Sequence, residues 1–361
     1  MTRKTLVTLL YAGVLLGAGA LKVGATVFAT PPAGTGATGP DSITDGAGSI
    51  WVSYDGGTNS DGTNPNTFST IVRYSPTGAE QNIYKIEGDV DGLKYNPFTG
   101  QVWALQNQDA NSHLTIIDPV TGTLTSVNYA VTSPTQGYDD VVFAKSGTYL
   151  SETNPSGPND VTLVKVVPNT NPIEVTNLLT SGSPGTNVVT GQTNFVPSPQ
   201  PVDTDSLKLG PNGTLYQTTG ANRDTIAIYD PATNGLKYLT LTANGKAVSA
   251  MDDTLFVTSP SGILYATATT AGAGGNGEVD EFHISLPTGT LLASIGSLNE
   301  IAIVDPTTGN LTPFETGLDG IHGLDFVPSS VVPETSTILT GALTLIGGLL
   351  IAVRRRQKAV A

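Results

Sequence analysis

Five aspartates and one histidine recur at comparable points of the chain, each at the start of an apolar strand pattern. They are Asp41, Asp91, Asp140, Asp205, Asp253 and His322. Carboxylate oxygens are the ligands that Ca²⁺ prefers, and an imidazole can add a nitrogen ligand. A fold that brings the six side chains together would therefore create a cation site. The competing interpretation is that each aspartate accepts backbone hydrogen bonds and ends its own loop, once per repeat.

Two glycine-rich stretches carry weaker signals. Residues 55–66, DGGTNSDGTNPN, are rich in oxygen ligands, but the EF-hand frame that begins at Gly57 places Phe68 where a bidentate glutamate belongs. A solvated turn is favoured there, with a calcium site as the alternative. Residues 272–277, GAGGNG, match the dinucleotide-binding fingerprint in letters, yet a strand pattern follows where that motif requires a helix. This stretch is expected to be a flexible loop without a cofactor.

Motifs for hydrolytic chemistry are absent from the sequence. It contains no Gly-x-Ser-x-Gly, no His-Glu-x-x-His and no phosphate-binding Gly-Lys-Ser/Thr. His113 begins one predicted strand and His283 lies within another, so both are expected to be structural. No catalytic residue and no nucleotide cofactor are therefore predicted.

A repeat of about 40–60 residues supplies the elements that must position the aspartates. An apolar strand that ends in a Pro turn occurs six times, at Pro76, Pro119, Pro168, Pro231, Pro287 and Pro306. A strand pair that starts at one of the aspartates precedes most of these turns. Residues 181–202 lack strand alternation and are expected to form an inserted loop. Residues 322–328, HGLDFVP, match DGLKYNP from Asp91, which predicts a last strand that closes a ring begun at the other end of the chain.

These repeats favour an all-β fold, a single β-propeller over residues 38–328 with six blades preferred and five possible. An array of β-sandwiches is the alternative. In a propeller the first strand of each blade lines the central channel, so the recurring aspartates and His322 should converge near one of its mouths.

The composition indicates an exported, acidic protein. The chain has no cysteine, 42 glycines and 24 prolines, and its formal charge is −14. Stability must therefore come from burial and hydrogen bonding rather than disulfides, and many short strands joined by tight turns are expected. The negative charge disfavours nucleic-acid binding and favours divalent cations or basic partners.

Both ends of the chain carry apolar segments. Residues 1–29 resemble a signal peptide, with Arg3 and Lys4 before an apolar stretch; Ala29 is the preferred cleavage position, and Ala20 and Ala25 are alternatives. Residues 30–37 and 329–337 are expected to be linkers. Residues 338–353 are uncharged and long enough for a short transmembrane helix, and the basic tail 354–361 places the C-terminus in the cytoplasm.

The C-terminal pattern resembles a known family. Val332, Pro333 and Glu334, the short apolar helix and the cluster Arg354, Arg355 and Arg356 resemble the PEP-CTERM sorting signal of Gram-negative bacteria, although the usual second proline is Thr335. The resemblance implies recognition by an exosortase after transient anchoring in the inner membrane; a plain C-terminal anchor is the alternative. Many members accompany exopolysaccharide production, so it also implies a destination at the outer surface or in the extracellular matrix.

Two classes of function follow. The favoured one is a non-enzymatic surface or matrix protein whose propeller binds a polysaccharide or another protein. The alternative is a metal-dependent propeller hydrolase or lactonase that acts on an extracellular ester, lactone or phosphoester, because such enzymes hold a metal with carboxylates near the channel. Ca²⁺ is the cofactor that would suit the aspartates.

Overall fold

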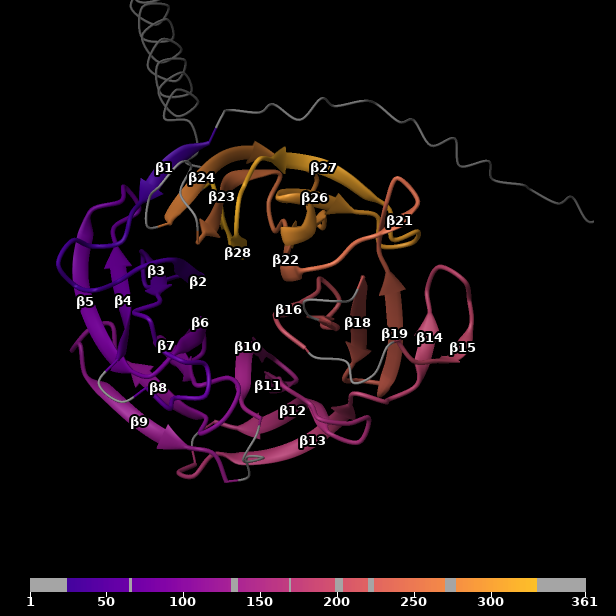
Figure 1. Cartoon of the computed structure of the whole chain (residues 1–361), viewed down its shortest axis with the longest axis horizontal. Helices are drawn as coiled ribbons and strands as arrows, with labels where there is room; N and C mark the ends of the chain where they lie inside the picture. Colours follow the sequence, from indigo (N-terminus) through magenta and orange to yellow (C-terminus); the bar gives the residue numbers. More distant parts are fainter. Residues whose placement is uncertain are drawn as a thin grey trace, which may run out of the picture.

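The computed structural model describes residues 25–64, 67–130, 136–168, 170–198, 204–219, 224–269 and 277–329. In these residues six antiparallel sheets surround a central channel, as Figure 1 shows. The expected six-bladed β-propeller is confirmed. We name the blades A to F; within each, the strands are given below from the channel to the rim.

Blade A contains β2 (Pro40–Gly46), β3 (Ser49–Tyr54), β4 (Phe68–Tyr74) and β5 (Glu80–Glu87). Blade B contains β6 (Val90–Asn96), β7 (Gln101–Gln106), β8 (His113–Ile117) and β9 (Leu124–Asn128). Blade C contains β10 (Tyr138–Ala144), β11 (Gly147–Glu152), β12 (Val161–Val167) and β13 (Glu174–Thr180).

Blade D contains β16 (Leu207–Leu209), β17 (Leu215–Thr218), β18 (Thr225–Asp230) and β19 (Gly235–Thr240). Blade E contains β22 (Met251–Phe256), β25 (Leu291–Ile295), β26 (Glu300–Val304) and β27 (Leu311–Thr316), with a 3₁₀ turn η1 (Gly296–Leu298). Blade F contains β28 (Ile321–Pro328), β23 (Ser261–Ala268), β24 (Glu278–Ser285) and β1 (Thr26–Ala29). A small ribbon, β20 (Thr242–Ala243) with β21 (Lys246–Ala247), follows blade D.

The Pro turns predicted from the sequence end the third strand of every blade. Local chemistry explains several of them, because the aspartate before the proline caps its own turn. The Asp118 carboxylate accepts a hydrogen bond from the Val120 backbone N–H at 2.8 Å, and Asp230 and Asp305 accept equivalent bonds. Proline has no N–H and its fixed φ suits the first turn position, so each strand ends there.

The hydrophobic core lies between the blades. Six buried clusters occupy the interfaces A–B, B–C, C–D, D–E, E–F and F–A. At the B–C interface, for example, Trp103 meets Phe143 edge to face with ring centroids 4.9 Å apart. Burying one such side chain stabilises the fold by roughly 1.5–3 kcal/mol. Every blade therefore depends on both of its neighbours.

Ring closure is more complex than expected. Strand β28 is the inner strand of blade F, and β1 from the N-terminal end is its outermost strand, beside β24 in Figure 1. The two middle strands, β23 and β24, come from a hairpin inserted between β22 and β25 of blade E. The expectation that Asp253 to Ala268 forms adjacent strands of one blade is therefore wrong. Strand alternation marks each strand but does not specify its partner.

Two segments expected to be loops or linkers belong to the propeller. Residues 181–202 contain a hairpin, β14 (Gly185–Asn187) and β15 (Thr193–Phe195), and β14 pairs in parallel with β19 on the rim of blade D. The propeller also begins at β1 rather than at residue 38. Residues 30–37 pack on the rim, where the Lys85 ammonium donates to the Thr35 carbonyl at 2.8 Å.

Most of the predicted terminal features lie outside the described residues. These include the apolar part of the signal peptide, the sorting residues Val332 to Glu334, the helix 338–353 and the arginine cluster 354–356. Within the described ranges, no helix is long and apolar enough to span a membrane.

Candidate functional site at one mouth of the channel

The inner strands begin with a local irregularity. Pairing between the first and second strands shifts register at residues 40–43, 90–93, 138–141, 251–254 and, in blade F, at 321–324. A β-bulge of this kind changes the direction of the side chains that follow it. Two residues lie inside each shift, for example Asp41 and Ser42 in blade A. The first of the two lines the channel mouth, and the second contacts a neighbouring blade.

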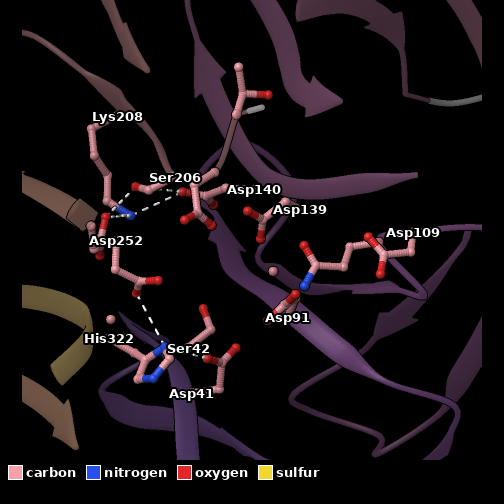
Figure 2. Close-up of a pocket in the computed structure, with 16 residues that line it drawn as sticks. Asp41, Ser42, Asp91, Asp109, Asp139, Asp140, Ser206, Lys208, Asp252 and His322 are labelled. Atoms are coloured by element: carbon pink, nitrogen blue, oxygen red, sulfur yellow. Dashed lines mark hydrogen bonds and ion pairs between the residues drawn. The ribbon is translucent and has the colours of Figure 1, made fainter. Parts of the chain in front are cut away.

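The first bulge residues of five blades, together with Asp205 just before β16 of blade D, form a ring, which we call the acidic ring. Its members are Asp41, Asp91, Asp139, Asp205, Asp252 and His322. They line a cavity of about 280 Å³, and Figure 2 shows most of them pointing into it from different blades. Five carboxylates and one imidazole therefore converge at this mouth.

Four of the six residues predicted from the sequence belong to this ring. The other two, Asp140 and Asp253, are each displaced by one position, and their neighbours Asp139 and Asp252 take their places. The bulge explains the error, because it shifts the strand alternation by one residue. A usable signal exists in the sequence of blades A to C: counting back two positions from the first apolar residue after the aspartates, which is Ile43, Leu93 or Val141, reaches the ring member.

Asp140 and Asp253 anchor neighbouring inner strands. Asp140 accepts hydrogen bonds from the backbone N–H groups of Val141 at 2.7 Å and Leu207 at 2.9 Å. Asp253 accepts from Thr254 and, across the E–F interface, from Leu324, both at 2.7 Å. For these two residues the alternative interpretation, an aspartate that accepts backbone hydrogen bonds, describes the structure.

Lys208 neutralises this anchor pair. Its ammonium lies 3.0 Å from Asp140 and 2.9 Å from Asp253; both aspartates are buried, and the Lys208 side chain is 11% exposed. Burial favours the uncharged amine, but the two carboxylates outweigh it and raise the pKa of Lys208. For Asp140, burial acts against ionisation, yet Lys208 and the Leu207 N–H bring its pKa below the usual value. Lys208 was not predicted from the sequence.

The ring members associate in pairs from adjacent blades. The carboxyls of Asp41 and Asp91 are hydrogen-bonded to each other, as are those of Asp139 and Asp205. His322 Nδ1 lies 3.3 Å from Asp41 and 3.5 Å from Asp252, and the dashed line in Figure 2 marks the contact with Asp252.

Burial and mutual repulsion control the ionisation of the ring. Burial is the largest cause that raises the pKa of Asp41, and the Asp91 charge adds to it. Burial likewise raises the pKa of Asp139 and Asp205. For His322, burial favours the neutral ring, but Asp252 and Asp91 outweigh it and raise its pKa. Perturbed groups that share one cavity are a common mark of a functional site.

The same pairing appears in the second bulge residues. In blades A, C and E a side chain accepts the backbone N–H of the next blade: Ser42 from Leu93 at 3.1 Å, Asp140 from Leu207, and Asp253 from Leu324. In blades B and F the corresponding residues are Gly92 and Gly323, and in blade D it is Ser206, whose hydroxyl donates to Asp253 of blade E. A side chain that accepts a backbone N–H therefore joins A–B, C–D and E–F, and the D–E boundary is bridged too, by Ser206 and Lys208.

Charge in the cavity is strongly unbalanced. Eight aspartates line it, against Lys208 and His322, and Lys208 is already shared by two carboxylates. One carboxyl oxygen, Oδ2 of the buried Asp139, has no hydrogen-bond partner. However, no three acidic or histidine side chains of the described chain are arranged to hold one metal ion as they stand. A cation would have to replace the hydrogen bonds within the carboxyl pairs.

The other predicted residues lie away from the ring. His113 Nδ1 contacts the Asn111 carbonyl at 2.9 Å, and His283 is exposed on β24; neither lines the cavity. In the loop from Asp55, that carboxylate accepts the Gly57 N–H at 2.8 Å, and Asp61 accepts the Thr63 N–H at 2.9 Å. These are the local bonds of turn-forming aspartates.

Comparisons with known proteins give similarity to solved structures only. No family model matches the chain, and no curated protein matches it. Virginiamycin B lyase from Staphylococcus aureus is 14% identical, with 81% of this chain and 90% of that chain covered and a TM-score of 0.44. The periplasmic gluconolactonase PpgL from Pseudomonas aeruginosa is 12% identical, with 80% and 88% covered and a TM-score of 0.47. Because these identities and TM-scores are low, the β-propeller assignment rests on the strand pairing of this chain. The acidic ring is interpreted from the residues that form it.

Proposed function

We propose that this protein is an exported binding module whose acidic ring holds a divalent cation, Ca²⁺ being the ion that carboxylate oxygens favour. The observation that carries the proposal is the convergence of five aspartates from five blades at one channel mouth, with an excess of carboxylates over cations. A bound ion would relieve their repulsion. It would also present an open coordination position to the outside.

The ligand that suits such a mouth is an anionic, hydroxyl-rich polysaccharide. Its carboxylate or hydroxyl groups could complete the coordination of Ca²⁺, which takes six to eight oxygen ligands. Without the ion, the acidic ring would repel the same groups. Binding should therefore require calcium.

Calcium binding is tested by thermal unfolding of the purified protein in calcium and in chelator. A ligand at a hundredfold excess over its Kd stabilises the folded state by about 2.7 kcal/mol, so we expect Tm to rise by roughly 5 °C in calcium. The double variant Asp91→Asn, Asp205→Asn should lose this rise. Asp118→Asn with Asp230→Asn is the matched control, since both residues lie in turns away from the cavity. Equal wild-type Tm values in the two buffers would contradict the proposal.

A hydrolase is the second candidate, and His322 is the observation that favours it. An imidazole held by the carboxylates of Asp41 and Asp252 in a cavity can act as a general base. Isothermal titration with alginate oligomers, and an assay with lactone, ester and phosphoester substrates, separate the two functions. Calcium-dependent alginate binding without turnover supports the binding module. Turnover that His322→Gln abolishes supports the hydrolase.

We further propose that the protein is exported and sorted to the outer surface of a Gram-negative cell. Residues 1–29 and the tail from Val332 to Arg356 support this, because they have the order of a signal peptide and a PEP-CTERM-like sorting signal. Signal peptidase and an exosortase would then be processing partners. Exopolysaccharide or another surface protein would be the partner of the mature form.

A further inference from the structure

The other mouth of the channel contains a second cavity, of about 580 Å³. It lies at the carboxyl ends of the inner strands, whereas the acidic ring lies at their beginnings. Lys208 lines both cavities, and its ion pairs with Asp140 and Asp253 hold it between them. The two cavities are therefore separate sites with different linings.

The walls of this second cavity are largely apolar and aromatic. Inner strands of several blades contribute side chains to them, among them Tyr95, Phe143, Leu209, Leu255, Phe256 and Phe326. Small-molecule sites typically have this character and a volume of roughly 300–1,000 Å³, with a few polar groups that orient the ligand. The volume is sufficient for a two-ring molecule.

Four charged side chains line the cavity: Asp45, Lys94, Lys208 and Asp325. Lys208 is already paired with two carboxylates, and Asp45 is exposed. Asp325 on β28 is only 6% exposed, and its Oδ2 has no hydrogen-bond partner, which is costly for a buried carboxyl group. Lys94 on β6 lines the same cavity and makes no hydrogen bond or ion pair with other described residues. Lys94 is near enough to act on the charge of Asp325. Beside the aromatic wall, the cavity thus offers a buried acceptor in Asp325 and, in Lys94, a cation without an ion-pair partner in the described chain, with the exposed Asp45 near both.

We propose that this cavity binds a small zwitterion with an aromatic body, the chemistry of an aromatic amino acid. Its ammonium group donates to Asp325, its carboxylate pairs with Lys94, and its ring packs among the aromatic side chains. Charge-assisted bonds of this kind are about twice as strong as neutral ones. The site is independent of the calcium function proposed above.

A series of indole compounds tests the proposal on the intact protein. L-Tryptophan carries both charged groups, tryptamine only the amine, indole-3-acetate only the carboxylate, and indole neither. Isothermal titration should give the tightest binding for L-tryptophan. Asp325→Asn should weaken L-tryptophan and tryptamine by about tenfold or more, the size expected for a lost bond to a charged group, and leave indole-3-acetate unchanged. Lys94→Gln should weaken L-tryptophan and indole-3-acetate and leave tryptamine unchanged.

Asp205→Asn is the control at the acidic ring. Because Lys208 separates the cavities, this variant should bind L-tryptophan as the wild type does even if it loses calcium. No L-tryptophan binding at millimolar concentration, equal binding of all four compounds, or equal weakening by Asp205→Asn would overturn the proposal. Circular dichroism of each variant ensures that a loss of binding reflects the site and not unfolding.

Discussion

At the residue scale, position within the bulge decides what an aspartate does. Asp139 and Asp140 are adjacent, yet Asp139 faces the cavity with an unpartnered oxygen while Asp140 accepts two backbone N–H groups and a lysine. The same division separates Asp252 from Asp253. Residue type alone could not distinguish the members of either pair, because backbone direction, not side-chain chemistry, assigns the roles.

Lys208 should be essential for stability. Lys208→Met keeps most of the side-chain volume but leaves Asp140 and Asp253 as buried charges without a counterion, which typically costs about 3–5 kcal/mol. Chemical denaturation should show this loss in the free energy of unfolding. Lys237→Met, at an exposed position of β19, is the control, and a change within about 0.5 kcal/mol is expected there. An equally small loss for Lys208→Met would mean that backbone N–H groups suffice to hold the carboxylates.

At the element scale, glycines allow the inner strands of different blade pairs to approach closely. Within a pair, a side chain such as Ser42 bridges to the next strand. Between blades B and C, which belong to different pairs, the carbonyl oxygen of Asp139 lies 1.8 Å from where a Cβ on Gly92 would be, so no side chain fits. A glycine stands at two of the three boundaries between these pairs, B–C and F–A, whereas Ser206 and Lys208 bridge the third, D–E.

Substituting that glycine should therefore destabilise the propeller. Gly92→Ala must displace the backbone of β10, and overpacking of this kind costs about 1–3 kcal/mol or more. Urea unfolding measures the change. Gly157→Ala is the matched control, because a Cβ there meets nothing within 4 Å and the backbone φ is not positive. Equal stability of the two variants would show that β10 can move away without cost.

At the scale of the whole molecule, the sequence predicts the number of blades better than their connections. Six Pro turns identified six third strands, since a proline acts locally, helped in three of the turns by the aspartate before it. The insertion of β23 and β24 into blade F was not predictable in this way, because strand partners are chosen by packing between distant segments. The second cavity was missed for the same reason: Lys94 and Asp325 are separated by most of the chain and show no shared motif.

Closure of the ring by β1 predicts where the signal peptide ends. Cleavage after Ala29 would remove β1 and leave the edge of β24 unpaired, which favours aggregation. The mature N-terminus should therefore lie at or before Thr26, as cleavage after Ala20 or Ala25 would give. Intact-mass measurement of the protein from its native host checks this. A recombinant chain that begins at Thr30 should melt at a lower temperature than one that begins at Thr26; equal melting would show that β1 is dispensable.

The closure of blade F also determines the order in which the blades can form during synthesis. Thr26 contacts Glu281 across a separation of 255 residues, so β1 leaves the ribosome long before its partner exists. At translation rates of about 5–20 residues per second, the interval is on the order of 10–50 s. During that time blades A to D can form in order while β1 stays without a sheet. Blade F can be completed only after β28, its inner strand, has been made, so the last step of assembly joins the oldest and the newest parts of the propeller.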